Sequence, residues 1–285
     1  MKKVLLATSA LVAFAGAASA EIAMKGYARF GAQYTEGAAD EITVDQRMNV
    51  DLTGTGASDN GLSFSAKVRM RAEEAGAAGT AMTINGARYS VSAGGMELAV
   101  GNIYGAVDSM PGLYAGSVGL TGLGYANVVS NWTGQSYSSR GAGVNGVELM
   151  YSVGDLSLHL STQDGGATEI AVAYAMNGVN VAVASSDAGA NAEWVATVGT
   201  SIGGVGVGLA AASNAGDMAL TLSGSFSVGA ATTVSAYVAN DESQADASAF
   251  GLGVVHNLGG GASVRGGVAS THGTNRADLG VQFSF

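Results

Sequence analysis

The feature that most constrains this chain is a two-residue alternation of apolar with small or polar residues, repeated in short segments from residue 22 onward. Successive side chains of a β-strand point to opposite faces, so this period gives each strand one apolar and one polar face. The clearest example, residues 218–228, alternates Met218, Leu220, Leu222 and Phe226 with alanine, threonine and serine. Hydrophobic residues make up 47% of the chain, yet no run after residue 20 reaches the roughly 20 apolar residues of a membrane helix. The pattern is typical of transmembrane strands, which face lipid on one side and a lumen on the other.

The alternation predicts about 16 strands and an all-β fold, a transmembrane up-and-down antiparallel β-barrel. A closed ring leaves no unpaired sheet edge, as the interior of a membrane requires. A change of phase near Gly86 indicates a bulge or bend within one strand. The expected strands lie near residues 22–35, 41–54, 61–73, 79–92, 95–104, 142–153, 155–163, 168–177, 179–186, 191–202, 204–213, 217–228, 231–240, 246–258, 261–270 and 275–285.

Tight and loose connections alternate along the chain. The tight ones, such as Asn177-Gly178 and Gly203-Gly204, are rich in residues that tolerate positive φ. The loose ones, such as residues 36–40 and 241–245, are longer and polar. An up-and-down barrel with short turns at one rim and loops at the other produces this rhythm.

One long segment, from about residue 103 to residue 140, interrupts the alternation and contains the only proline, Pro111. A segment of this length without regular structure is uncommon in a compact domain and is usually functional. We expect it to fold into the lumen as a loop that sets the width of the bore. The residues expected to form this constriction are Tyr104, Asp108, Pro111 and Tyr114.

Residues 1–20 have the composition of a cleavable signal peptide. Lys2 and Lys3 precede an apolar run from residue 4 to residue 17, and Ala18-Ser19-Ala20 forms a small-residue cleavage site. We therefore expect an exported chain with one barrel domain, residues 21–285. The chain contains no cysteine, so disulfides do not hold this fold together.

The charge of the chain excludes nucleic acid as a partner. Without Lys2 and Lys3, ten of the 12 basic residues remain against 22 acidic ones, a net charge of about −12. No cofactor, metal site or catalytic group is expected. The three histidines, His159, His256 and His272, do not accompany a serine and a carboxylate in the pattern of a triad. His159 and His256 lie on or near the apolar phase of their strands.

The basic residues gather on the polar face of strands at the two ends of the chain. In a closed barrel the last strand pairs with the first, so they would form one arc of the inner wall, together with Asp45, Asp51 and Asp278. Charged patches at a narrow point are how pores select ions, although each residue alone could be an ordinary solvated charge. We name this set the basic arc: Lys25, Arg29, Arg47, Lys67, Arg69, Arg71, Arg265 and Arg276.

Three stretches resemble the general diffusion porins of alphaproteobacteria, of the Rhodobacter type. They are EIAMKGYARFGAQY at the start, DLTGTGASDNGLSFSAKVRMRAEE on the second hairpin, and LGGGASVRGGVASTHGTNRADLGVQFSF at the end. The resemblance implies a homotrimer of sixteen-stranded barrels in the outer membrane of a Gram-negative cell, in contact with its lipid and lipopolysaccharide. It also implies a third loop folded inside as an eyelet, passive diffusion of small hydrophilic solutes and ions, and Phe285 as the assembly signal.

By position, the resemblance makes Arg29, Arg47, Lys67, Arg69 and Arg71 the basic wall of the eyelet. The inward loop of the family is typically rich in carboxylates, whereas here Asp108 is the only acid between residues 102 and 140. The constriction is therefore expected to favour cations less, or even to prefer anions.

Three alternatives remain open at this point. A substrate-selective channel of the same fold for small anions would show flux that saturates with one solute. A barrel enzyme is disfavoured by the placement of the histidines. A secreted β-rich adhesin is disfavoured by the terminal phenylalanine and the two-faced strands.

Overall fold

The computed structural model describes residues 20–74, 80–125, 127–130, 132, 145–187, 193–214 and 216–285. Its strands are β1 Glu21–Thr35, β2 Ile42–Ala57, β3 Ser63–Glu74, β4 Thr80–Ile84, β5 Arg88–Ala93, β6 Met96–Asn102, β7 Asn145–Val153, β8 Leu156–Gln163, β9 Thr168–Met176, β10 Val179–Ser186, β11 Glu193–Ile202, β12 Val205–Asn214, β13 Asp217–Val228, β14 Thr232–Asp241, β15 Ser248–Gly259, β16 Ala262–Thr271 and β17 Thr274–Ser284. No helix in these ranges is long and apolar enough to cross a membrane.

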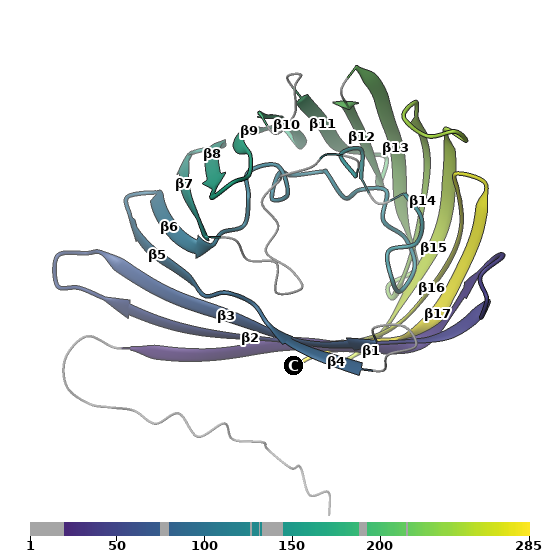
Figure 1. The fold of residues 1–285 in the computed structure, drawn as a ribbon, viewed down its shortest axis with the longest axis horizontal. Helices are drawn as coiled ribbons and strands as arrows, with labels where there is room; N and C mark the ends of the chain where they lie inside the picture. Colours follow the sequence, from purple (N-terminus) through teal and green to yellow (C-terminus); the bar gives the residue numbers. More distant parts are fainter. Residues whose placement is uncertain are drawn as a thin grey trace, which may run out of the picture.

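The strands form one closed antiparallel ring (Figure 1). Neighbours in sequence pair with one another, and β1 pairs with both β2 and β17. β4 and β5 both pair with β3, at opposite ends of it, so the 17 strands occupy 16 positions in the wall. The predicted barrel of about 16 strands is confirmed. The break between β4 and β5 covers residues 85–87, where the sequence predicted a bulge or bend at Gly86.

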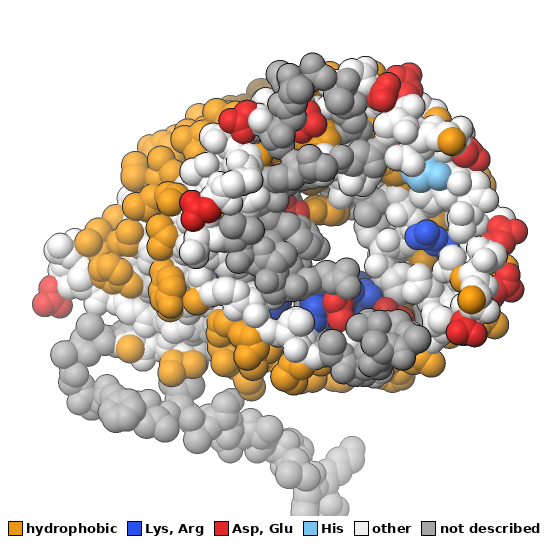
Figure 2. All heavy atoms as spheres, in the orientation of Figure 1, with side chains coloured by type: hydrophobic (Ala, Val, Ile, Leu, Met, Phe, Trp, Pro, Cys, Tyr) orange, Lys and Arg blue, Asp and Glu red, His pale blue; other side chains and the backbone are white. Residues whose placement is uncertain are grey.

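The wall has the two faces that the alternation predicted. On β13, Leu222 keeps 49% of its surface exposed and Leu220 44%, whereas the adjacent Ala219 and Thr221 are almost fully buried. The exposed apolar side chains lie on the outside of the ring, as the orange rim of Figure 2 shows. A surface of this kind is stable only against hydrocarbon, so the barrel spans a membrane.

The shortest connections are two-residue turns, and several of them have positive φ at both positions. Gly94 and Gly95 have φ of 58° and 84°, and Asn177 and Gly178 have φ of 51° and 80°. These are the torsions of type I′ turns, whose twist matches that of the flanking strands. The tight rim of the barrel is therefore encoded locally in the sequence.

The last residue helps to close the ring. The N–H of Gly26 donates to the Phe285 carbonyl at 2.8 Å, and the Phe285 N–H donates to the Gly26 carbonyl at 3.0 Å. The ring of Phe285 lies directly over Gly26, where a Cβ atom would come within 2.7 Å of it. The role of Phe285 as an assembly signal stays a prediction, and residues 1–19 of the predicted signal peptide lie outside the described residues.

The segment after β6 carries the main apolar cluster of the protein. Val107, Leu113, Val118, Leu123 and Val128 are almost fully buried, and they pack against small wall residues of β9 to β16. Figure 1 shows this trace within the area that the strands enclose. Of the predicted loop 103–140, residues 126, 131 and 133–140 lie outside the described part.

The position of each side chain relative to lipid gives a first prediction. Leu222→Arg places a cation on the lipid face near the middle of β13, so it should destabilise the folded barrel by about 2–4 kcal/mol. Ser225→Arg, on the lumen face of the same strand, should cost much less. Reversible unfolding in lipid vesicles measures both variants, and equal losses would contradict the assignment of faces.

Candidate functional site

The segment after β6 is attached at its tip to Asp278 of β17. The carboxylate accepts hydrogen bonds from the N–H of Leu120 at 2.9 Å, from the N–H of Thr121 at 2.7 Å and from the Thr121 hydroxyl at 2.8 Å. Asp278 is only 7% exposed. The sequence placed Asp278 on the wall of the basic arc as a possible partner for cations. It forms no ion pair with a described cation and instead accepts hydrogen bonds from the segment.

Other anchors lie on distant strands. The Thr197 hydroxyl of β11 donates to the Pro111 carbonyl at 2.7 Å, and the N–H of Tyr125 donates to the Tyr237 hydroxyl of β14 at 3.0 Å. Closer to β6, the N–H of Val107 donates to Glu169 of β9 at 3.1 Å. Because these partners come from β9, β11, β14 and β17, the segment is held along much of the inner wall.

Glycines in the wall allow this close approach. A Cβ atom at Gly280 would come within 2.6 Å of the Leu120 side chain, and one at Gly253 within 2.8 Å of the Gly119 nitrogen. Contacts below 3.0 Å would force one of the two elements to move. The absence of side chains on β15 and β17 at these points therefore lets the tip lie against the backbone of the wall.

The strands that carry the basic arc are neighbours in the ring, in the order β16, β17, β1, β2 and β3. Four of its eight cations form close ion pairs with carboxylates of the same wall. Asp45 and Asp51 are among these partners, as the sequence suggested. The ion pairs are Arg29–Asp45 at 2.8 Å, Arg47–Glu73 at 2.8 Å, Arg69–Asp51 at 2.6 Å and Lys67–Asp51 at 3.0 Å.

The remaining members of the basic arc behave differently from one another. Arg71 is buried, its Nε donates to the Asn49 side chain at 2.8 Å, and one of its Nη atoms forms a longer ion pair of 3.9 Å with Glu73. Lys25, Arg265 and Arg276 form no ion pair with any described carboxylate. Arg276 lies opposite Thr35 at the end of β1 that leads into a loose loop, so it is distant along the wall from Lys25.

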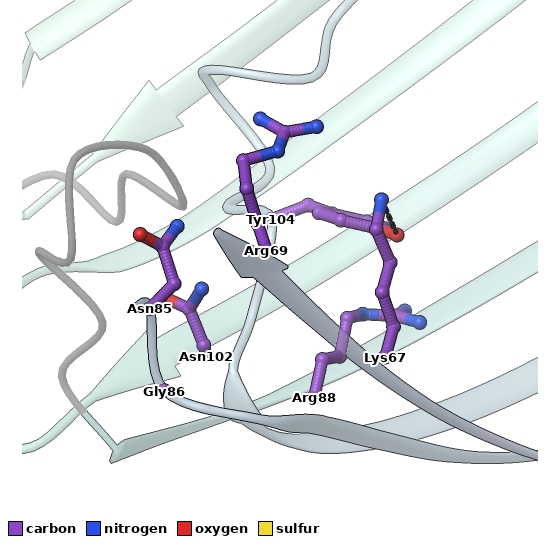
Figure 3. A pocket seen from close by; sticks show the side chains of 7 residues that line it. All are labelled: Lys67, Arg69, Asn85, Gly86, Arg88, Asn102 and Tyr104. Carbon is purple, nitrogen blue, oxygen red and sulfur yellow. Dashed lines mark hydrogen bonds between the residues drawn. The ribbon is translucent and has the colours of Figure 1, made fainter. Parts of the chain in front are cut away.

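The sequence interpretation missed Arg88. Its guanidinium lies 4.1 Å from the centre of the Tyr104 ring and forms ion pairs of 2.6 Å with both Glu97 and Glu148. Lys67 reaches the same tyrosine, with its Nζ 3.4 Å from the hydroxyl. Lys67, Arg88 and Tyr104 line a small recess together with Arg69 and residues 85, 86 and 102 (Figure 3). Reading the alternation anew after Gly86 would have placed Arg88 on the polar face with Ser90 and Ser92.

Glu148 of β7 fixes the start of the segment. It is 1% exposed, and its oxygens lie 2.6 Å from Arg88 Nε, 2.9 Å from His159 Nε2 and 3.0 Å from the Tyr104 nitrogen. The expectation that His159 lies on or near the apolar phase is wrong. The exposed apolar residues of β8 are Leu156 and Leu160, so the odd-numbered His159 faces inward.

The four predicted constriction residues do not form one cluster. Tyr104 lies over the basic arc, whereas Pro111 contacts β11. Asp108 accepts a hydrogen bond from the Tyr114 hydroxyl. Burial raises the pKa of the Asp108 carboxyl above its usual range, and the charge of Glu169 adds to this effect, although the bond from Tyr114 opposes it.

Within the described ranges, no group of three or more histidine or acidic side chains is placed to hold a metal ion. The site is therefore a polar wall with a segment fixed against it. Its chemistry is that of fixed charges and hydrogen bonds in water.

Comparisons with known proteins agree with this geometry. The family model described as Gram-negative porin matches residues 7–276. A porin of Fuscovulum blasticum is 32% identical over 93% of this chain and the whole of that protein. Among solved structures, a triple mutant of the Rhodopseudomonas blastica porin has a TM-score of 0.81 at 29% identity, and another mutant of that porin has 0.81 at 30% identity. Both cover 93% of this chain and 100% of the solved chain.

The anchoring by Asp278 gives a second prediction. Asp278→Ala removes the acceptor of three hydrogen bonds, and each bond to a charged group contributes about 1.5–3 kcal/mol. The amides of Leu120 and Thr121 should then exchange with solvent at least about tenfold faster, as measured by hydrogen exchange and mass spectrometry. Asp155→Ala, in a turn at the rim, serves as the control, and equal exchange in both variants would contradict the anchoring role.

The half-buried carboxyl of Asp108 gives a third prediction. Since its folded pKa is raised, the folded state holds the proton more tightly, and stability falls as pH rises from 3.8 through the raised value. Asp108→Asn should remove this part of the pH dependence of thermal unfolding in detergent. Asp155→Asn should retain it. A profile of Asp108→Asn identical to that of the unmodified protein would show that burial of Asp108 does not affect stability.

Proposed function

Because the chain belongs to the Gram-negative porins and forms an outer-membrane channel for passive diffusion, we propose that the segment after β6 is its constriction. The observation that carries this proposal is the set of hydrogen bonds from the segment to inward-facing side chains of β9, β11, β14 and β17. A segment held in this way reduces the open cross-section of the lumen. We place the narrow point between the basic arc, with Arg88, and residues 104–121.

The solutes that fit this channel are small and hydrophilic. Outside the apolar cluster, the inner wall carries charged side chains on one side and polar or small residues on the other, such as Asn180, Ser223 and Ser225. Such a surface remains wetted and disfavours apolar molecules, which would lose contact with water on entry. The family model and the relatives named above are porins, which favours passive diffusion over a substrate-selective channel and points to a channel rather than an enzyme.

We propose that ion selectivity is weak and in favour of anions. Five carboxylates, Asp45, Asp51, Glu73, Glu97 and Glu148, lie between the cations of the wall and reduce their field. Lys25, Arg265 and Arg276 have no such partner among the described residues. On the facing segment, Asp108 is the only acid between residues 102 and 140.

Assembly and export complete the proposal. The composition of residues 1–20 supports a signal peptide removed after Ala20, and resemblance to the family supports a homotrimer in outer-membrane lipid. Mass spectrometry of protein extracted from the membrane would find Glu21 as the first residue. Light scattering of the detergent complex would give three copies of the chain.

The charge of the wall gives a fourth prediction, tested by reversal potential in planar bilayers under a salt gradient. The unmodified channel should prefer anions slightly. Arg69→Glu changes the wall by two charge units, and at roughly 10 Å from an ion in water this should shift the permeability ratio toward cations by about two- to fourfold.

Ala230→Glu adds a carboxylate at an exposed turn of the rim and is the control for charge outside the constriction. If both substitutions shift the reversal potential equally, Arg69 does not lie at the narrow point.

A further inference from the structure

A second cavity lies between the tip of the segment and the wall. It shares no lining residue with the recess beside Tyr104. Its volume is about 290 Å³. The segment contributes residues 117–122 to its lining. The wall contributes side chains from five adjacent strands, which are Arg29 of β1, Ser235 of β14, Val255 of β15, Arg265 of β16 and Gln282 of β17.

Two arginines meet at this cavity because of the register of three strands. Arg29 lies opposite Gln282 on β17, and Arg265 lies opposite Gly280 on the same strand. The two positions on β17 are two residues apart and share a face, so the arginines are diagonal neighbours across one strand. At Gly280 the wall has no side chain of its own, and the Leu120 side chain of the segment packs there. Two guanidinium groups placed in this way repel each other, and an anion beside them offsets the repulsion.

The wall compensates only one of these charges. Arg29 forms an ion pair of 2.8 Å with Asp45 and donates to the Leu120 carbonyl at 3.1 Å. Arg265 donates from Nε to the Ser263 hydroxyl at 3.1 Å. Its two Nη atoms have no hydrogen-bond acceptor among the described residues.

No carboxylate lines the cavity. Asp278 is close by, but its oxygens already accept bonds from the N–H groups of Leu120 and Thr121 and from the Thr121 hydroxyl. The cavity therefore has an excess of positive charge that a solute can balance.

We propose that this cavity binds a small tetrahedral oxyanion, with the Nη groups of Arg265 as its principal donors. A guanidinium presents two parallel N–H groups, which match two oxygens of such an anion. The hydroxyls of Ser117 and Ser235 and the amide of Gln282 line the same cavity and can donate to the remaining oxygens. The site rests on the proposed function, because the anion reaches it through the open channel. It holds a passing anion without making the channel selective for it.

The test uses sulfate as the probe, since its charge does not change near neutral pH. Channels of the full-length mature protein are opened in potassium chloride, and potassium sulfate is added at constant ionic strength. Bound sulfate should reduce the chloride current in a saturable manner. Arg265→Gln should raise the half-maximal sulfate concentration about tenfold or more, because it removes the charge-assisted bonds.

Two further variants separate a site from general electrostatics. Lys25→Gln removes the same charge from another part of the wall and should leave the half-maximal concentration within about twofold of its original value, because screening weakens the effect of a distant exposed charge. Arg265→Lys keeps the charge but loses the paired N–H groups and should bind sulfate more weakly than arginine. Each current is normalised to that of the same variant in chloride alone.

The outcomes are distinct. A saturable effect that Arg265→Gln weakens and Lys25→Gln does not supports the site. The absence of saturation in the unmodified channel, or equal responses of Arg265→Gln and Lys25→Gln, overturns it. A channel that carries no chloride current at all would instead contradict the proposed function.

Discussion

The structure depends on the hydrogen bonds that join β1 to β17. In hydrocarbon, an unpaired backbone N–H or C=O costs several kcal/mol, so a sheet can span a membrane only if its first and last strands pair. Nine residue pairs, from Tyr27 with Ser284 to Thr35 with Arg276, make this closure. Once the ring is closed, the pleat alone decides which side chains meet lipid and which line the lumen.

Closure also explains the distribution of charge. The basic residues of the first three strands and those of the last two are far apart in sequence, yet the pairing of β17 with β1 makes them neighbours. The carboxylates that stabilise them come from the same strands, as with Asp45 beside Arg29 and Asp51 beside Arg69. Asp278 belongs to this wall, and its carboxylate binds the tip of the segment at Leu120 and Thr121. It therefore fixes the position of the tip relative to the basic arc.

The barrel, its strand number and the break near Gly86 could be predicted from the sequence, because the alternation of residues is a local consequence of the pleat. Two-residue turns such as Asn177-Gly178 could be predicted equally well, because only glycine and a few residues such as asparagine adopt positive φ readily. The contacts of the segment were not predictable, because Leu120 and Asp278 are joined only by the closed ring. Arg88 was missed because the break at residues 85–87 reverses the phase. His159 could have been placed from the sequence, because Leu158 and Leu160 flank it while Ser157 and Ser161 share its phase.

The most direct test of a wetted channel narrowed by this segment is the swelling of liposomes that contain the protein, in a series of uncharged sugars of increasing size. The swelling rate should fall steeply with molecular size and rise linearly with the concentration of each small sugar. If no sugar caused swelling, or if the rate saturated with the concentration of one sugar alone, a passive channel of this kind would be contradicted.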